Sequence, residues 1–207
     1  MPSDTRAGDA DFGSLRADLD DLDDRHLMAW VAQRGVSARL VEPGVPTPTV
    51  PTAAAALGVG VQSILKSLVF SVRGRPRLVI AAGVDRVRYP ALAEVWGVSR
   101  REVRMCTPEE ASTITGYRVG AMPPFGHREA LPTLVDERCV RPERTVYAGG
   151  GSRSALLELT SAELLRALAE NTPEADARRP RSLGQDPEIA ELPSPVITDV
   201  TTPAVKE

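Results

Sequence analysis

The chain has 207 residues and a mass of 22.2 kDa, and 42% of its residues are apolar but only 4% aromatic. This length suits a single domain. No apolar run approaches the roughly 20 residues that cross a bilayer, and the acidic start is unlike that of a signal peptide. Two cysteines and two histidines are too few for a disulfide framework, a four-ligand zinc site or most metal-hydrolase centres. We therefore expect a cytoplasmic protein with no metal, no other cofactor and no membrane partner.

The net charge of −3 is an average over three unlike segments. Residues 1–24 contain eight Asp and two Arg, and residues 171–207 contain seven acidic and four basic side chains. The middle of the chain, residues 25–170, has 13 acidic and 19 basic side chains, a net charge of +6. A basic unit of this kind suits a polyanion such as RNA, because each neutralised phosphate releases counterions. A basic surface that is only solvated, with no partner, is the alternative interpretation.

The two acidic ends lack the apolar residues of a folded domain. Residues 171–207 carry six prolines and no aromatic residue, so they bury too little surface to offset the entropy of ordering. We predict an acidic, mostly flexible segment over residues 1–24, a folded domain over residues 25–170, and a Pro-rich disordered tail over residues 171–207.

Hydrophobic spacing, caps and turn residues predict short helices and strands in an irregular order. The predicted elements are, in chain order, helices at 25–33 and 52–57, strands at 67–72 and 77–82, a helix at 89–96, a helix after Thr107, strands at 134–136, 145–148 and 156–159, and a helix after Thr160. Thr107 and Glu110 have the spacing of a capping box, with Pro108 at the first helical position. Strands and helices that interleave without regular alternation favour an α/β or α+β domain with a mixed sheet over a doubly wound fold.

One lysine is exceptional in the predicted domain. The chain has 23 Arg and two Lys, and Lys206 lies in the tail, so Lys66 is the only lysine of residues 25–170. It enters an apolar strand, where a charge is costly unless it has a partner. A site that needs a compact point charge on a phosphate or carbonyl oxygen prefers an ammonium to a guanidinium. A lysine that extends from an edge strand to water is the alternative interpretation.

A stretch rich in Gly and Pro, residues 115–127, predicts a stiff loop. Its prolines fix φ and remove amide donors, and its glycines let the backbone approach a ligand closely. The amides that remain, notably near Gly120 and Ala121, are suited to holding a carbonyl oxygen. A plain connecting loop is the alternative.

Several segments, taken in order, resemble the YbaK and prolyl-tRNA-synthetase-associated editing domain family over about residues 25–170. These segments are Lys66 in its apolar strand, residues 116–120 (GYRVG) with Pro124 and Gly126, residues 131–136 (LPTLVD), residues 146–151 (VYAGGG) and residues 157–159 (LEL). The resemblance implies a single domain with a mixed, largely antiparallel sheet wrapped by helices. It also implies the activity of a trans-editing aminoacyl-tRNA deacylase, which hydrolyses the ester of a mischarged tRNA.

The resemblance further implies which residues form the site. Lys66 matches the family lysine that contacts the terminal adenosine of the tRNA, and Gly120 matches the first residue of the Gly-x-x-x-Pro loop that positions the aminoacyl carbonyl. We therefore expect Lys66 and Gly120 to be catalytic. The residues expected to contact the substrate are Thr47, Ala121, Pro124, Gly126, His127 and Asp136. The family has no nucleophile triad, and the chain has no Gly-x-Ser-x-Gly motif, so water and the ribose hydroxyl of the substrate are expected to do the chemistry.

Some of these residues also have ordinary structural interpretations. Thr47 is compatible with a turn or a cap, His127 with a surface histidine, and Asp136 with the end of a strand. In addition, Leu40 and Leu156 stand where cysteine-editing members carry a tyrosine and an aspartate. These apolar residues argue against a cysteinyl substrate, and we expect a small amino acid on a tRNA of the proline type.

The alternative function is a module that binds a tRNA end, a nucleotide or a synthetase without catalysis. The expected partners are the 3′ end of an aminoacyl-tRNA and, as a second candidate, an aminoacyl-tRNA synthetase, but not DNA.

Overall fold

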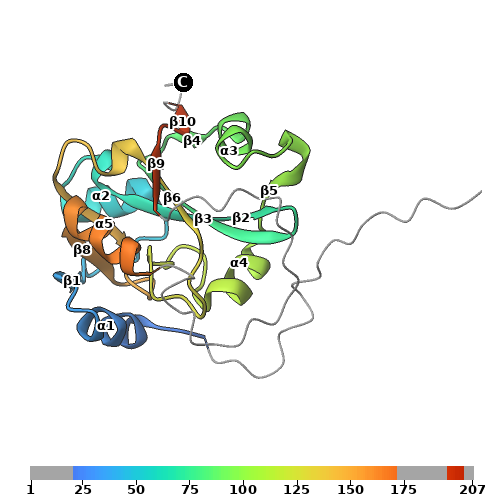
Figure 1. Cartoon of the computed structure of the whole chain (residues 1–207). Coiled ribbons are helices and arrows are strands. Elements are labelled where there is room, and N and C mark those ends of the chain that lie inside the picture. The colour runs from blue at the N-terminus through green and yellow to red at the C-terminus, as the bar shows by residue number, and fades with distance from the viewer. Residues whose placement is uncertain (1–20, 172–194, 203–207) are drawn as a thin grey trace, which may run out of the picture.

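The computed structural model of the chain describes residues 21–171 and 195–202 (Figure 1). Within these residues the α-helices are α1 (Asp24–Gln33), α2 (Val50–Leu57), α3 (Tyr89–Val95), α4 (Pro108–Thr115) and α5 (Ser161–Glu170). The strands are β1 (Ala38–Val41), β2 (Leu65–Val72), β3 (Arg75–Ala82), β4 (Arg86–Val87), β5 (Val103–Met105), β6 (Thr133–Asp136), β7 (Thr145–Gly149), β8 (Leu156–Thr160), β9 (Val196–Thr198) and β10 (Thr201–Thr202). Short 3-10 helices are η2 (Val61–Ser63), η3 (Arg100–Glu102) and η4 (Glu137–Cys139). Every predicted element is present, whereas β1, β4, β5, β9 and β10 are additional.

The main sheet has the strand order β5-β2-β3-β6-β9. β2 and β3 form an antiparallel hairpin and β5 pairs antiparallel with β2, whereas β3 and β6 are parallel, as are β6 and β9. A second, antiparallel sheet has the order β1-β8-β7, and β10 pairs with β4. Figure 1 shows the helices placed around these sheets. The pairing confirms the predicted α/β (α+β) domain with a mixed, largely antiparallel sheet.

Local sequence signals explain where several elements begin and turn. The side chains of Thr107 and Glu110 form the predicted capping box at α4, and the Thr160 side chain caps α5. Arg73 and Gly74, with φ values of 50° and 75°, form the turn between β2 and β3. Two consecutive residues with positive φ are what a two-residue hairpin turn of type I′ requires.

The two faces of the β2–β3 hairpin belong to two apolar clusters. Leu65 and Val69 of β2 lie in a cluster that includes residues of α1 and α5, whereas Phe70 and Val72 lie in a cluster that includes residues of α3. This alternation is the two-residue period of a strand. By the same period, Lys66 shares the face of the α3 cluster.

The prediction of a disordered tail is wrong for residues 195–202. Val196–Thr198 pairs with β6, Thr201–Thr202 pairs with β4, and Val200 between them is completely buried. Six of these eight residues are Val, Ile or Thr, which favour strands, but the composition of the whole tail does not show this local signal or the distant strands with which the backbone pairs. The rest of the predicted tail, residues 172–194 and 203–207, lies outside the described residues.

The folded domain also begins before residue 25. The side chain of Asp23 accepts a hydrogen bond from the backbone N of His26 at 3.0 Å and so caps α1. The backbone N of Leu22 donates to the carbonyl of Gly116 at 2.8 Å. The predicted flexible segment 1–24 therefore contributes its last residues to the fold, and residues 1–20 lie outside the described part.

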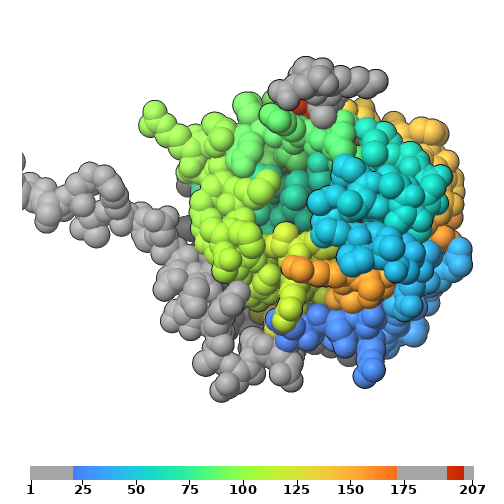
Figure 2. Space-filling view, turned by 180° about the vertical axis from the view of Figure 1, so that it is seen from behind, coloured from blue at the N-terminus to red at the C-terminus, as the bar shows by residue number. Residues whose placement is uncertain are grey.

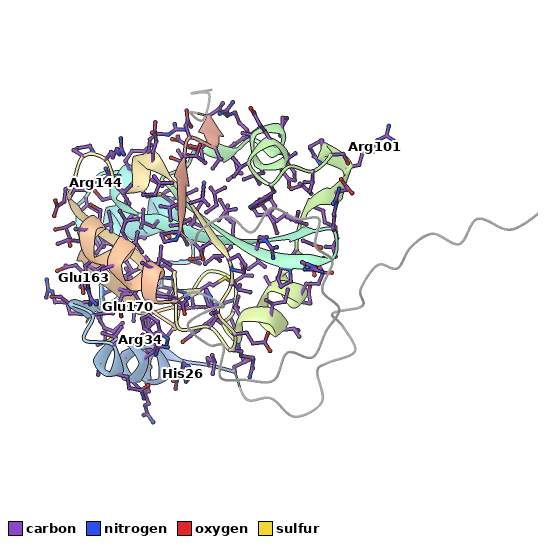
Figure 3. All side chains as sticks on the ribbon, viewed as in Figure 1. His26, Arg34, Arg101, Arg144, Glu163 and Glu170 are labelled. Atoms are coloured by element: carbon purple, nitrogen blue, oxygen red, sulfur yellow. The ribbon has the colours of Figure 1, made fainter. Side chains whose placement is uncertain are left out.

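Surface ion pairs contribute little to this fold. Arg166 pairs with Glu163 and Glu170, which Figure 3 labels along α5, at 2.5 and 2.7 Å. Exposed pairs of this kind stabilise a protein by about 0–1 kcal/mol. The exposed Arg101, at the edge of the molecule in Figure 3, extends away from the domain. The buried apolar clusters therefore dominate the stability of the domain.

Candidate functional site

Lys66 lies near the start of β2, opposite Ala81 of β3, and its side chain is partly buried. Its Nζ donates a hydrogen bond to the backbone carbonyl of Asp85, in the turn that follows β3. Burial lowers the pKa of the Lys66 ammonium, and Asp85, Cys139 and Asp136 oppose that shift. Lys66 is the only lysine within the described residues. One ammonium is therefore held at a defined position beside the sheet.

The Gly/Pro loop between α4 and β6 is fastened to the strand that carries Lys66. The backbone carbonyl of Pro123 accepts two hydrogen bonds, from Ser67 Oγ at 2.9 Å and from His127 Nε2 at 2.9 Å. β5 pairs only with residues 70–72 of β2, and the loop contacts β2 nearer its start, at Ser67, whose side chain lies on the opposite face of the strand from that of Lys66. Ser67 is therefore a site residue that the sequence analysis missed, although it directly follows Lys66.

Gly120 lies in the exposed part of this loop with a φ of 90°, a left-handed conformation that side chains disfavour. A Cβ at Gly120 would lie 3.4 Å from the carbonyl oxygen of Pro48, so the segment before α2 is its neighbour. Within the described residues the backbone amide of Gly120 makes no hydrogen bond. This exposed amide fits the expected role of holding an aminoacyl carbonyl.

The amide of Ala121 is already used within the loop. It donates to the carbonyl of Arg118 at 3.0 Å, and the carbonyl of Ala121 accepts from the Gly151 amide at 2.9 Å. Ala121 is also 2% exposed. A turn inside the loop therefore uses this donor, and the contact of Ala121 with the substrate stays a prediction.

Thr47, Pro124 and Gly126 are buried where we expected substrate contacts. The amide of Thr47 donates to the carbonyl of Arg153 at 3.2 Å, which joins the segment before α2 to the β7–β8 connection. A Cβ at Gly126 would lie 3.4 Å from Trp30 of α1. These three residues are therefore packed inside the domain, on the buried side of the loop and of the segment before α2. Their direct contact with a substrate stays a prediction.

Asp136 is completely buried and its carboxylate is occupied. Oδ1 accepts a hydrogen bond from the Arg138 amide at 3.0 Å, and Oδ2 accepts from the Val200 amide and from Thr201 Oγ1, both at 3.0 Å. Asp136 therefore has a structural role in the fold, and its contact with the substrate stays a prediction. The sequence could not reveal this role, because two of its partners are more than 60 residues away.

His127 is buried beneath the loop and is 7% exposed. Its Nε2–H donates to Pro123, and its Nδ1 has no hydrogen-bond partner within the described residues. Burial lowers the pKa of His127 to about 4. A neutral imidazole therefore supports the loop, and the contact of His127 with the substrate stays a prediction.

We expect His127 to make the domain less stable in acid. Between pH 6.5 and about 4 the unfolded chain binds a proton at His127 that the folded chain does not bind. The free energy of unfolding therefore falls as the pH falls through this window, by up to about 3 kcal/mol. His127→Gln removes the titrating group, and denaturant unfolding at pH 7 and pH 4.5 should show a smaller acid loss for this variant than for wild type. His26→Gln, at the exposed histidine, is the control, and equal acid losses in all three proteins would contradict the prediction.

The loop and the segment before α2 border a hollow in one face of the molecule. Figure 2 shows the surface hollowed between the blue segment that includes α2 and the yellow-green segment that includes α4 and the loop after it. The contact of Gly120 with Pro48 joins these two segments. Arg118 of the Gly/Pro loop and Arg153 of the β7–β8 connection are both exposed, and Arg118 pairs with Asp21 at 3.0 Å.

The described ranges contain no group of three side chains placed to ligate a metal, and no helix there is long and apolar enough to cross a membrane. Cys106 and Cys139 are both buried and unpaired. Burial raises the pKa of Cys106 to about 11, and it also raises the pKa of Cys139. Both thiols are therefore protonated near neutral pH, and neither has the thiolate character of a nucleophile.

The two positions that depart from cysteine-editing relatives lie in neighbouring strands. Leu156 of β8 is 4% exposed and packs in a small cluster with Ala53 and Ala54 of α2 and with Ile64. Leu40 of β1 is partly buried and lies opposite the next residue of β8. The apolar side chain of Leu156 therefore fills space between α2 and the start of β2.

A second concave region lies on the three-stranded sheet. A depression of about 300 Å³ is lined by Ser37, Ala38, Arg39, Thr145, Glu158, Leu159 and Thr160. The Arg39–Glu158 ion pair, 2.7 Å from Nε to Oε1, occupies it. It contains none of the predicted site residues, so we place the functional site at the hollow beside Gly120.

Known proteins resemble this chain in sequence and in fold. Residues 45–167 match the family model of the aminoacyl-tRNA editing domain. The uncharacterized protein YwhH of Bacillus subtilis (strain 168) is 33% identical over 117 residues, which are 56% of this chain and 72% of that protein. Among solved structures, the hypothetical protein APE2540 has a TM-score of 0.66 at 29% identity, and the match covers 86% of this chain and 99% of that chain. A proposed trans-editing enzyme for prolyl tRNA synthetase has a TM-score of 0.63 at 33% identity, and the match covers 70% of this chain and 90% of that chain. The chain therefore belongs to the aminoacyl-tRNA editing domain family.

Proposed function

We propose that this protein acts in trans on mischarged tRNA and hydrolyses the ester that joins the amino acid to the 3′-terminal ribose. The family domain over residues 45–167 supports an aminoacyl-tRNA substrate. The observation that carries the proposal is the hydrogen bond from Ser67 to Pro123, which attaches the loop with the exposed Gly120 amide to β2 at the residue that directly follows Lys66.

In this proposal the chemistry depends on positioning and polarisation. The Gly120 amide donates to the carbonyl oxygen of the ester and stabilises the negative charge that develops there. Lys66 binds the phosphate of the terminal nucleotide or the same carbonyl oxygen. A water molecule attacks the carbonyl carbon, the bond from that carbon to the ribose oxygen breaks, and the leaving ribose oxygen takes a proton from the water through the neighbouring ribose hydroxyl. An aminoacyl ester is already reactive, so a nucleophilic side chain is not required.

We infer that the substrate carries a small amino acid on a tRNA of the proline type. Leu156 fills space between α2 and the start of β2 and offers no polar group to an amino-acid side chain. A relative of similar fold is described as a proposed trans-editing enzyme for prolyl tRNA synthetase. Both points favour a small substrate side chain over cysteine.

A deacylation panel tests this function. Wild-type protein is mixed with alanyl-, seryl- and cysteinyl-tRNA of the proline type, and with the same amino acids on their cognate tRNAs. We expect hydrolysis of one small amino acid on the proline-type tRNA, with the cysteinyl ester cleaved slowly. Absence of hydrolysis across the panel, in protein with a cooperative melting curve, would contradict the proposal.

A second candidate is a module that binds the tRNA end without cleaving the ester. The apolar residues Leu40 and Leu156, at positions that are polar in cysteine-editing relatives, favour it. Such a module would give a tRNA complex that weakens steeply as salt is raised while the deacylation panel stays silent.

A further inference from the structure

The C-terminal strands lie outside the residues that match the family domain, yet they are joined to the site. The family match ends at residue 167, whereas β9 and β10 follow near residue 200. β9 pairs with β6, and β10 pairs with β4, which begins directly after Asp85. Figure 1 shows this C-terminal segment, in red, beside β6 and β4.

Arg138 connects this segment to the turn that holds Lys66. Its guanidinium contacts three carboxylates, with Nη1 3.0 Å from Asp85, Nε 3.2 Å from Asp136 and Nη2 2.9 Å from Asp199. The side chains of Asp85 and Asp136 are 7% and 0% exposed. Buried carboxylates are costly unless they are paired, so the contacts with the guanidinium offset the cost of burying both of them.

The C-terminal segment is held to the same centre by its backbone. Asp136 accepts hydrogen bonds from the Val200 amide and from Thr201 Oγ1. Arg138 Nη2 donates to the carbonyl of Thr201, and Val200 is completely buried. Residues 199–201 are therefore integrated into the domain by buried polar contacts and not by strand pairing alone.

Lys66 is at the other end of this network. Its Nζ donates to the backbone carbonyl of Asp85, and the Asp85 side chain is held by Arg138 and, at 3.5 Å, by Gln62 Nε2. Arg144, labelled in Figure 3, donates to the carbonyl of Gln62 at 3.0 Å and also to that of Arg138. The position of the Lys66 ammonium therefore depends on a turn that the Arg138 centre fixes.

We propose that Arg138 and Asp199 are positioning residues for Lys66. They hold the Asp85 turn, whose carbonyl oxygen binds the ammonium, so the segment outside the family domain is part of the working site. The activity readout of this inference rests on the proposed function, whereas its structural readout does not.

The structural readout is the side-chain NMR signal of Lys66. In full-length protein carrying Lys206→Arg, Lys66 is the only lysine, and selective ¹³C labelling of lysine gives one Cε resonance. We expect Asp199→Ala and Arg138→Gln to shift this resonance and the midpoint of its pH titration. Asp199→Asn keeps an acceptor for Arg138 and should restore most of the wild-type signal. Arg88→Gln is the matched control, because Arg88 Nη2 donates to the Asp199 carbonyl at 3.1 Å from outside the Arg138 centre.

The kinetic readout is the rate of deacylation by the same variants. We expect kcat to fall about tenfold in Asp199→Ala at an unchanged KM, because a small displacement of the Lys66 ammonium lowers the rate of the chemical step more than it weakens substrate binding. Arg138→Gln leaves two buried carboxylates without their cation and is vulnerable to unfolding, so Asp199→Ala, at a side chain that is 52% exposed, is the decisive variant.

An unchanged Lys66 resonance in folded Asp199→Ala overturns the inference, whatever its melting temperature. An equal shift in Arg88→Gln also overturns it, because loosening of the segment would then suffice. A shift of the Lys66 resonance in Asp199→Ala and Arg138→Gln but not in Arg88→Gln supports the inference. If these shifts occur and no aminoacyl-tRNA is hydrolysed, only the proposed function fails.

Discussion

Replacing Lys66 with alanine is expected to lower kcat/KM for deacylation by roughly 100-fold or more. Loss of one group that stabilises developing charge in a preorganised site costs on the order of 100- to 1,000-fold in rate. The fold should survive, because the side chain is only partly buried and burial already disfavours its charge.

Lys66→Arg separates the charge from its geometry. The planar guanidinium is larger than the ammonium and bonds best in pairs, whereas a single backbone carbonyl accepts from Lys66 within the described residues. We therefore expect Lys66→Arg to recover less than about a tenth of the wild-type rate, although the charge is retained.

The measurement is single-turnover hydrolysis of the best substrate from the deacylation panel, with a melting curve for each variant. Lys206→Ala removes the only other lysine of the chain and is expected to keep full activity. If Lys66→Ala kept the wild-type rate with a native melting curve, the assigned role of Lys66 would be wrong.

Features that depend on residues close in sequence were predictable. The β2–β3 hairpin depends on Arg73 and Gly74 between two apolar runs, and α4 depends on the pair Thr107 and Glu110. Lys66 was identified because the chain otherwise uses arginine for positive charge in its folded part. These signals are local, so composition and spacing carry them without knowledge of the fold.

Features that depend on distant partners were not predictable. The tail looked disordered because nothing in residues 195–202 indicates that Asp136 accepts from the Val200 amide. The same contact gives an expected substrate residue a structural role. For His127 the sequence offered a substrate contact or a surface position, but the side chain is buried and its Nε2 donates to Pro123. In each case a buried polar group is satisfied by a residue that sequence spacing does not bring near.

Gly149→Ala is expected to destabilise the domain and to inactivate the site together. A Cβ at this position in β7 would lie 2.3 Å from the carbonyl oxygen of Met122 and 2.6 Å from that of Ala121. Both atoms belong to the backbone of the Gly/Pro loop, which cannot move aside as a flexible side chain would. β7 and the loop must therefore separate, and overpacking of this kind costs about 2 to 3 kcal/mol of the free energy of unfolding.

The separation should reach the reacting groups through one hydrogen bond. The Gly151 amide, two residues after Gly149, donates to the carbonyl of Ala121 at 2.9 Å, and Ala121 directly follows Gly120. A shift of about 1 Å in a group that positions the substrate can cost roughly 100-fold in rate, so kcat/KM should fall by that order at temperatures where the variant is still folded. Gly60→Ala is the matched control, because Gly60 has an ordinary φ of −67° and no atom within 4 Å of a built Cβ. The measurements are denaturant unfolding and single-turnover hydrolysis of both variants. A Gly149→Ala variant with wild-type stability and activity would mean that the loop does not pack tightly against β7 and that the position of the loop does not determine the rate.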